Sequence, residues 1–311
     1  MQRDLPAVEA TALVKDFGET RAVDGISLVV PTGAIYGVLG PNGAGKTTTL
    51  RMLLGIIDPS SGSRRLLGRE RPIEAAHEVG YLPEERGLYP AMTAREAIAF
   101  MGALRGLPIA DGRRRADGLL AAHGLGDWAR KPIRTLSKGM AQTVQLLGTL
   151  VHKPRLIVLD EPFSGLDAIN QARLEALIRG EAAAGATILF STHVIAHAER
   201  LCERIAIIAG GRLAFEGLVD EARSRLRPVV RLRTRASDGP WRAAIPPAAR
   251  LDAGEYVFAL PEGGPEPLLK ALIDGGAGIE TLAIERPGLH DAFVAIAGEA
   301  AAAAMGQGQA S

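Results

Sequence analysis

The sequence predicts an α/β fold with an inserted helical subdomain, followed by a small α+β domain. An apolar run at residues 35–39 leads directly into a Gly-rich loop and a helical segment, 47–54, a passage typical of α/β domains that bind nucleotides. Continuous apolar runs at 156–159 and 187–190 alternate with helical segments, as buried parallel strands do. Beyond Pro228 the chain changes to shorter strands and helices, which indicates a separate domain.

Composition excludes several classes of protein. With 36 basic and 35 acidic side chains and a net charge of +1, the chain has no global field to attract nucleic acid, so we expect no nucleic-acid partner. The single cysteine, Cys202, cannot form an internal disulfide, which fits a reducing compartment, and we interpret it as a buried apolar residue. Residues 1–10 lack the apolar stretch of a signal peptide, and no run of about 18 apolar residues occurs. We therefore expect a cytoplasmic protein that does not itself cross a membrane.

Further strands are predicted before the Gly-rich loop and near the end of the first domain. An alternating stretch at 8–14 and an apolar one at 22–30 indicate two strands on either side of a turn at 16–19. Two runs at 205–209 and 212–215, separated by two glycines, predict a closing hairpin.

The chain divides into three predicted parts. Residues 93–125 are rich in Ala, Arg and Leu without β signals, so we place a helical subdomain at about 90–140, inside a first domain that covers 1–225. A small α+β domain is predicted at 226–298. Its expected strands and helices are 229–235, 256–260, 265–273, 279–284 and 289–296. Residues 299–311 are mostly Ala, Gly and Gln, and we expect a flexible tail.

The Gly-rich loop matches the P-loop pattern of Gly, four residues, Gly, Lys, and Ser or Thr. Its residues are Gly40, Pro41, Asn42, Gly43, Ala44, Gly45, Lys46 and Thr47. Glycines let successive backbone N–H groups point at the β and γ phosphates, the Lys46 ammonium neutralises their charge, and the Thr47 hydroxyl can bind Mg²⁺. The helix that follows presents its N-terminus to the same anion. Composition alone would produce this match by chance in roughly one per cent of such chains.

A second motif, Leu-Ile-Val-Leu-Asp-Glu, ends at Asp160 and Glu161 and resembles a Walker B segment. Asp160 would hold the Mg²⁺ shell, and Glu161 could act as general base toward the attacking water. Taken alone, a strand capped by two solvated acids is about as probable as a site. The P-loop upstream favours the site.

The motif Leu-Ser-Lys-Gly-Met at 136–140 decides between the many families of P-loop ATPases. Ser137 is predicted to cap a helix running to Leu150. The N-terminus of a helix is also a site for anions. Taken alone, a helix cap without a binding role is the more probable interpretation of Ser137. Because the motif precedes the Walker B segment by about one helix and Ser-Gly-Leu-Asp follows at 164–167, the chain resembles the ABC (ATP-binding cassette) family, with its signature motif and D-loop.

The resemblance covers about residues 8–217 and assigns further roles. Phe17 stands where a cassette usually has a Tyr that stacks on adenine, Glu84 occupies the Q-loop position, and His193 resembles the switch histidine. Catalysis is expected from Glu161 and His193, and Mg²⁺ binding from Thr47, Glu84 and Asp160. The residues expected to bind nucleotide are Phe17, the loop Gly40 to Thr47, Thr48, Glu84, Ser137, Lys138, Gly139, Asp160 and Asp167. His197, one turn after His193, we interpret as structural.

Two positions depart from the family pattern. At Glu84 a carboxylate replaces the usual carboxamide, so an oxygen remains for Mg²⁺ while the N–H donor is lost. Lys138 replaces a signature glycine, and a lysine beside an ATP phosphate is electrostatically reasonable. Both substitutions, and the Arg-Pro-Gly-Leu-His-Asp-Ala-Phe pattern at 286–293, are similar to those of bacterial export cassettes of the sodium and multidrug type.

The resemblance implies an ATP-hydrolysing subunit that powers a separate membrane permease from the inner face of the cell membrane, and similarity to the export cassettes implies that the permease is an exporter. It implies ATP and Mg²⁺ as ligands and a second copy of the chain as partner. A soluble ABC-type ATPase not coupled to transport is the alternative, although the chain lacks paired cassettes and long coiled-coil insertions. A module that binds ATP without hydrolysing it conflicts with Glu161 and His193, and a P-loop kinase would have no use for Ser137 and Asp167 in these contexts.

Overall fold

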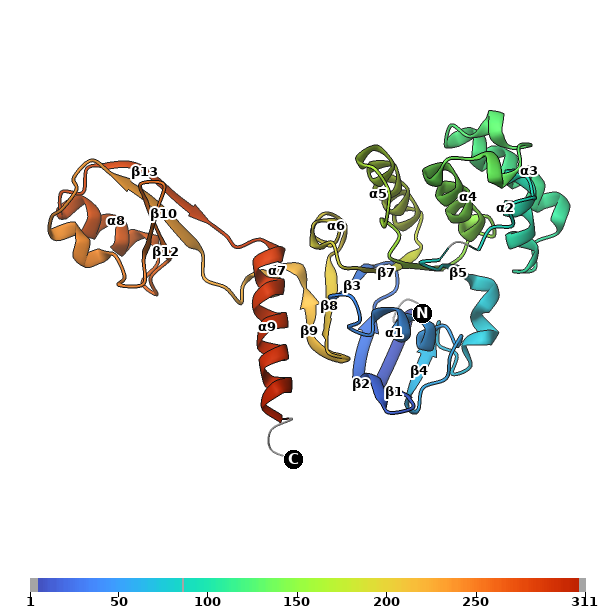
Figure 1. Cartoon of the computed structure of the whole chain (residues 1–311), viewed down its shortest axis with the longest axis horizontal. Coiled ribbons are helices and arrows are strands. Elements are labelled where there is room, and N and C mark those ends of the chain that lie inside the picture. The colour runs from blue at the N-terminus through green and yellow to red at the C-terminus, as the bar shows by residue number, and fades with distance from the viewer. Residues whose placement is uncertain (1–4, 86, 308–311) are drawn as a thin grey trace. The chain divides into compact units, whose positions relative to one another are not determined.

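The computed structural model describes residues 5–85 and 87–307. The chain forms two compact units (Figure 1). Residues up to Val219, together with those from Ile296 onward, belong to the first unit, and Asp220–Ala295 form the second. The division after Val219 lies a few residues ahead of the boundary placed after residue 225.

A six-stranded sheet, in the order β5-β6-β7-β3-β8-β9, runs through the first unit. The pairs from β5 to β8 are parallel, whereas β9 pairs antiparallel with β8 as the predicted hairpin. Because these strands are parallel, the carboxyl ends of β3, β6 and β7 meet at one edge, where ligands bind in such sheets. The strand bounds are β3 Ile35–Leu39, β5 Val79–Leu82, β6 Leu156–Asp160, β7 Thr187–Thr192, β8 Arg204–Ala209 and β9 Arg212–Leu218.

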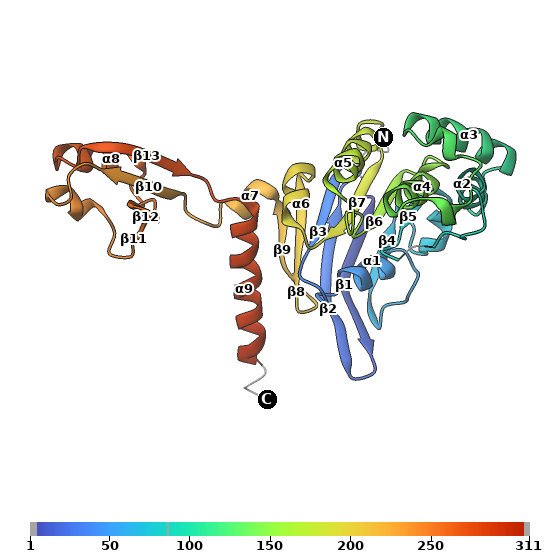
Figure 2. The same ribbon diagram turned by 45° about the horizontal axis from the view of Figure 1, so that its top comes forward.

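A three-stranded antiparallel sheet, in the order β2-β1-β4, packs over one face of the larger sheet. Helix α1 (Lys46–Leu53) lies between the two sheets (Figure 2). Its Leu50, Met52 and Leu53 are buried in their common core. The turn after β1 is shorter than predicted, because β1 continues through Phe17. The strands are β1 Val8–Phe17, β2 Thr20–Val30 and β4 Ser61–Leu66.

Helices α5 (Ala168–Ala183) and α6 (Ile195–Leu201) cover the other face of the six-stranded sheet (Figure 1). The helices of the predicted helical subdomain lie beside β5 (Figure 2). They pack around their own core, which includes Ile98, Leu120 and Val144. Its helices are α2 Ala94–Ala103, α3 Ile109–Ala122 and α4 Lys138–Leu150, with the short 3₁₀ helices η2 Gly126–Trp128 and η3 Ile133–Thr135. Another 3₁₀ helix, η1 (Pro72–Glu78), precedes β5, and α7 (Val219–Arg223) follows β9.

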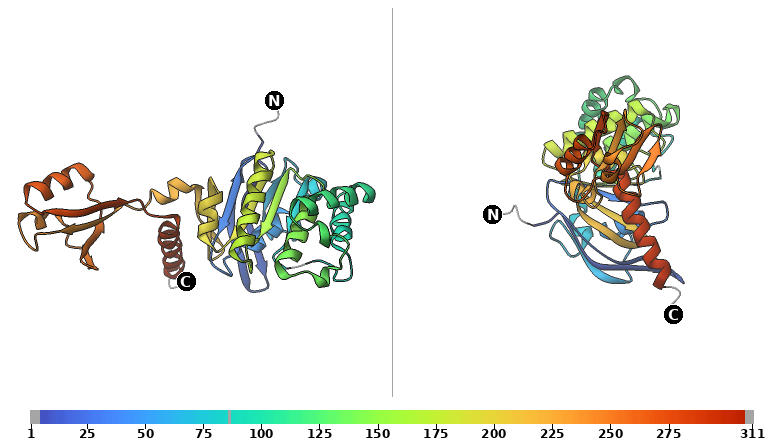
Figure 3. Two further views of the ribbon diagram at one scale, coloured as in Figure 1. Left: turned by 90° about the horizontal axis from the view of Figure 1, so that it is seen from above. Right: turned by 90° about the vertical axis from the view of Figure 1, so that its left-hand side faces the viewer.

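The second unit is a four-stranded antiparallel sheet, in the order β11-β12-β10-β13, with α8 across one face (Figure 3). Its core contains Val230, Leu232, Phe258 and Leu268, together with the buried Trp241 of η4 (Pro240–Ala244). The elements are β10 Val229–Thr234, β11 Arg250–Asp252, β12 Glu255–Ala259, α8 Pro265–Asp274 and β13 Ile279–Glu285.

Three expectations differ from the structure. The flexible tail predicted from residue 299 is wrong as far as Gln307, because α9 runs unbroken over Leu289–Gln307; alanine is the strongest helix former, so an Ala run extends a helix already begun. Residues 308–311 of that tail lie outside the described residues. Strands β4 and β5 were not anticipated, since β4 is polar and β5 has only four residues.

None of the helices in residues 5–85 and 87–307 combines the length and the apolar character that a bilayer crossing requires.

Candidate functional site

The P-loop connects β3 to α1 and is shaped by two glycines. Gly45 has φ of 97°, and a Cβ there would stand 2.6 Å from the carbonyl oxygen of Ala22. A Cβ at Gly40 would overlap the carbonyl oxygen of Ile208. Only glycine fits either place, so the loop packs against β2 and β8 while its N–H groups and the start of α1 turn toward the sheet edge.

Lys46 is held inside this loop. Its Nζ donates to the carbonyl oxygens of Gly40 at 2.8 Å and Pro41 at 3.1 Å, and lies 3.2 Å from Oε1 of Glu161. The side chain is only 6% exposed. The ammonium is therefore fixed at the centre of the predicted phosphate site.

Asp160, the last residue of β6, is buried and only half satisfied. Its Oδ1 accepts from the hydroxyls of Thr47 at 3.0 Å and Ser191 at 2.6 Å. Its Oδ2 is buried without a hydrogen-bond partner among the described residues. Burial raises the pKa of this carboxyl, with the hydroxyl hydrogen bonds opposing the shift. A buried carboxylate with a free oxygen beside a threonine hydroxyl is a fit for a divalent cation.

Glu161 adopts a conformation that a non-glycine residue rarely has, with φ of 48°. Its backbone N–H donates to Oγ of Ser191 at 3.0 Å, and Oε2 lies 2.9 Å from Nδ1 of His193. Oε1 accepts no directional hydrogen bond among the described residues, although Lys46 is near enough to supply charge. Strain of this kind, of order 1–3 kcal/mol, is typical of functional positions. The bend turns the carboxylate toward Lys46 and His193.

Glu84 and Lys138 reach the same edge from other elements. Both line a cavity of about 190 Å³ that also contains Asp160 and Glu161. Glu84 lies on an exposed segment after β5, and Lys138 is the first residue of α4. The structure thus brings the predicted Q-loop carboxylate and the signature lysine to the acidic end of β6.

Ser137 and Asp167 both cap helices. Ser137 Oγ accepts from the N–H of Met140 at 3.3 Å and starts α4, while Asp167 Oδ1 accepts from the N–H of Asn170 at 2.9 Å and starts α5. Gly139 lies so close to Asn170 that a Cβ there would meet its amide at 2.9 Å. Ser137 and Asp167 therefore have a structural role in this chain, and Ser137 remains exposed.

The remaining predicted residues lie around the loop. The ring of Phe17, at the end of β1, is 51% exposed, and the ammonium of Lys15 lies 5.2 Å from the ring centre. Three loop residues, Pro41, Asn42 and Gly43, are exposed, whereas Ala44 is buried and Thr48 is half-buried in α1. The Phe17 ring is thus accessible for stacking.

Comparisons with known proteins identify the family of this chain. The family described as "ABC transporter" matches residues 23–164. The uncharacterized ABC transporter ATP-binding protein YhaQ of Bacillus subtilis is 33% identical to this chain. The match covers 91% of this chain and 95% of the length of YhaQ. The chain belongs to the ABC transporter ATP-binding family. It is an ABC transporter ATPase.

Other relatives of this ATPase are described as export or resistance proteins. The daunorubicin/doxorubicin resistance ATP-binding protein DrrA of Streptomyces peucetius is 36% identical over 86% of this chain and 81% of its own. The Nod factor export ATP-binding protein I of Ralstonia nicotianae is 40% identical over 68% of this chain and 67% of its own. A solved ATP-binding subunit of an ABC transporter has a TM-score of 0.65, with 31% identity over 70% of this chain and 92% of that one.

One residue of the cassette's site was missed from the sequence. Ser191 donates to Asp160 and accepts from the N–H of Glu161, so it holds both carboxylates. It pairs with Asp160 in the register of β6 with β7. Nothing in the sequence says which strands are neighbours, so a serine at the end of β7 gave no local signal.

Proposed function

We propose that this ATPase hydrolyses ATP with Mg²⁺, using Glu161 as general base and His193 to orient it. The observation that carries the proposal is the contact chain from Lys46 to Glu161 to His193, beside the free oxygen of Asp160. Glu161 would accept the proton of the water whose oxygen attacks the γ phosphorus, while the bond from that phosphorus to the ADP oxygen breaks. His193 supports the carboxylate through its 2.9 Å contact.

Thr47 and Asp160 would hold Mg²⁺, with Glu84 as a further oxygen ligand from the same cavity. When bound, the ion supplies charge that neutralises the phosphate oxygens. Lys46 would exchange its contact with Glu161 for one with phosphate, since both are anions within reach of one ammonium. That exchange would free Glu161 to receive a proton.

The second half of the site would come from another copy of the chain. Ser137 is exposed at the start of α4, and a helix start carries about half a positive charge. We propose that Ser137, Lys138 and Gly139 of one copy close over the γ-phosphate held by the P-loop of the other. This would exclude water and strengthen the electrostatic contacts.

Mixing two inactive variants tests the shared site. Lys46→Ala removes the ammonium that would bind the phosphates, and Ser137→Arg blocks the start of α4. Each variant alone should therefore lose most of its ATPase activity. Mixed dimers contain one site with both defects and one intact site, and the mixture should recover part of the wild-type rate. A wild-type rate per chain that is unchanged at every protein concentration would contradict the composite site and leave Ser137 as a helix cap.

We further propose that the subunit powers a membrane permease that is an exporter, from the cytoplasmic face of the membrane. The support is the resistance and export functions in the names of relatives that cover most of the chain. The groove for the permease would be formed by residues 84–100, which join the site to the helical subdomain. Crosslinks from a copurifying permease should fall there. Crosslinks mainly beyond Pro228, or copurification with a soluble complex instead, would contradict this assignment.

The second unit offers no catalytic constellation among its described residues, and we propose a regulatory or dimer-supporting role for it. Deleting residues 228–311 should spare ATP binding. Loss of binding in a folded truncated chain would show that this region completes the site.

A further inference from the structure

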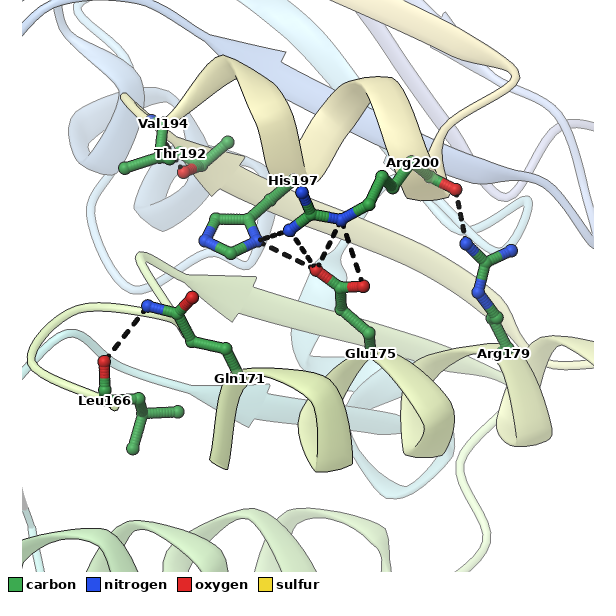
Figure 4. Close-up of polar contacts among 8 residues, drawn as sticks. All are labelled: Leu166, Gln171, Glu175, Arg179, Thr192, Val194, His197 and Arg200. Atoms are coloured by element: carbon green, nitrogen blue, oxygen red, sulfur yellow. Dashed lines mark hydrogen bonds and ion pairs between the residues drawn. The ribbon is translucent and has the colours of Figure 1, made fainter. Parts of the chain in front are cut away.

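A polar cluster between α5 and α6 lies behind the residues used so far. The carboxylate of Glu175 on α5 accepts hydrogen bonds from Arg200 on α6. Nε of Arg200 donates to Oε1 at 3.0 Å and to Oε2 at 3.2 Å, and Nη2 also donates to Oε1. Nδ1 of His197 lies 3.0 Å from the same Oε1 (Figure 4). His197 is 3% exposed and Glu175 15%. This is a charge-assisted cluster that is largely withdrawn from solvent.

The charges in the cluster favour a proton on Nδ1 of the imidazole. Nδ1 of His197 is within 3.0 Å of both the guanidinium of Arg200 and the carboxylate of Glu175. Because a guanidinium only donates and a carboxylate only accepts, Glu175 can satisfy both neighbours when Nδ1 carries the proton. Burial acts to raise the pKa of Glu175, but hydrogen bonds from Arg200 and His197 outweigh it and hold the pKa below the ordinary value. The carboxylate is therefore ionised at neutral pH.

His197 also contacts Phe163, the residue that precedes the D-loop at 164–167. Its ring stacks on Phe163, with ring centres 3.9 Å apart and planes within 9°. Phe163 is buried and accepts, through its carbonyl oxygen, from the N–H of Leu166. The ring that Glu175 orients is thus packed on the residue between Glu161 and the D-loop.

The other end of the D-loop is anchored to the same helix as Glu175. Gln171, one turn before Glu175 on α5, donates to the carbonyl oxygen of Leu166 at 3.0 Å (Figure 4). His193, one turn before His197 in sequence, contacts Glu161. A cavity of about 350 Å³ joins these groups, lined by Glu161, Gly165, Gln171, His193, His197 and Arg200. A continuous series of contacts therefore connects Glu161, the D-loop, α5 and α6, and returns to Glu161 through His193.

We propose that Glu175, His197 and Arg200 are positioning residues for hydrolysis, which hold the D-loop and the segment bearing His193 in a fixed relation to Glu161. The inference rests on the roles proposed for Glu161 and His193. When the hydrogen bonds of Glu175 with His197 and Arg200 are removed, α6 can move relative to α5. The contact of His193 with Glu161 then weakens without any change in the P-loop. The effect should therefore appear in the rate of the chemical step and not in ATP affinity.

Variants of the full chain test this by steady-state ATP hydrolysis with Mg²⁺. Glu175→Gln removes the charge with little change of shape, and His197→Phe keeps a ring on Phe163 but removes the donor. Each should lower kcat about tenfold, as expected for residues that support a reacting group, with KM for ATP changed less than about twofold. The double variant should be no worse than the more affected single one, because both changes weaken the same contact between Glu175 and His197. Glu70→Gln is the matched control, since it removes the charge from an exposed ion pair with Arg65 that is distant in sequence from Glu175 and His197. It should leave kcat unchanged.

Two further variants, Arg200→Ala and Arg200→Lys, address the risk that the buried substitutions unfold the protein, because the Arg200 side chain is half exposed. Alanine should lower kcat and lysine should restore part of it. An unchanged kcat in Glu175→Gln with nucleotide binding intact would overturn the proposal, and so would losses that multiply in the double variant or that follow the fall in Tm. If Glu161→Gln proves active, the base assignment fails separately, whatever the cluster variants show.

Discussion

Strand β6 begins beside Arg155, whose guanidinium donates to Glu78 at 2.8 Å, with Arg69 pairing to the same carboxylate at 2.6 Å. It ends in Asp160, whose Oδ2 is buried without a hydrogen-bond partner among the described residues. At the first end, the hydrogen bond from Arg155 holds the pKa of Glu78 below its ordinary value, and burial opposes the shift. At the other end, burial raises the pKa of Asp160.

This contrast separates charges that stabilise the fold from charges to which we assign a role in the proposed reaction. All five residues of β6 are buried, so burial of the strand alone does not explain the difference. Native proteins satisfy almost all buried polar groups, and exceptions are functional-site candidates. The left-handed backbone conformation of Glu161 adds a second unfavourable contribution to the free energy of folding at the same end of the strand. The carboxyl end of β6 is therefore kept in a state that a bound cation and phosphate would relieve.

The largest expected effect is that of Glu161→Gln, at the unsatisfied end. Glutamine keeps the shape but cannot accept the proton of the attacking water, so hydrolysis should slow by about 100-fold or more. ATP binding should remain, because the P-loop contacts are untouched. Rates from a phosphate-release assay and affinity from nucleotide titration would check both. An unfolded protein, or one that no longer binds ATP, would make Glu161 a structural residue.

Asp160→Asn should move activity and stability in opposite directions. Since its folded-state pKa is raised, Asp160 favours the folded state below its unfolded pKa of about 3.9 and loses that contribution as pH rises through the folded value. At neutral pH without Mg²⁺, asparagine removes a buried charge, and Tm should rise by about 2–4 °C, as for about 1 kcal/mol in a domain of this size. Hydrolysis should fall at least tenfold. A lower Tm in the absence of Mg²⁺ would show that the free oxygen of Asp160 is not costly.

Motifs that are continuous in the chain could be predicted, since local chemistry is enough to recognise them. The loop around Lys46 and the carboxylates Asp160 and Glu161 belong to this group, and the comparisons confirm the fold class and the ATPase family to which they pointed. The helix cap at Ser137 was also predicted from its residue type alone, and Ser137 does accept from Met140.

Features that depend on which strands and helices become neighbours could not be predicted. Ser191 joins the site only because β7 lies beside β6, and Glu175 meets His197 only because α5 lies beside α6. His197 was interpreted as structural, since one buried histidine carries no pattern. The bend at Glu161 had no signal either, because its residue type gives no reason for a positive φ.

The smallest expected effect is that of Glu78→Gln, at the end of β6 where the carboxylate is paired with two arginines. Since the folded-state pKa of Glu78 is lowered, its contribution to stability is complete above the unfolded pKa, about 4.3, and is lost as pH falls through the folded value. Arg155 is 64% exposed and Arg69 34%, so solvent screening limits the contribution to about 0.5–1 kcal/mol. At pH 7 the variant should unfold at a lower urea concentration than the wild type, and the gap should narrow below about pH 4. Its kcat should match the wild type, because the pair lies at the opposite end of the strand from the nucleotide site. A loss of kcat as large as that of Glu161→Gln would mean that the two ends of β6 are coupled, and the division between stabilising and reactive charges would then fail.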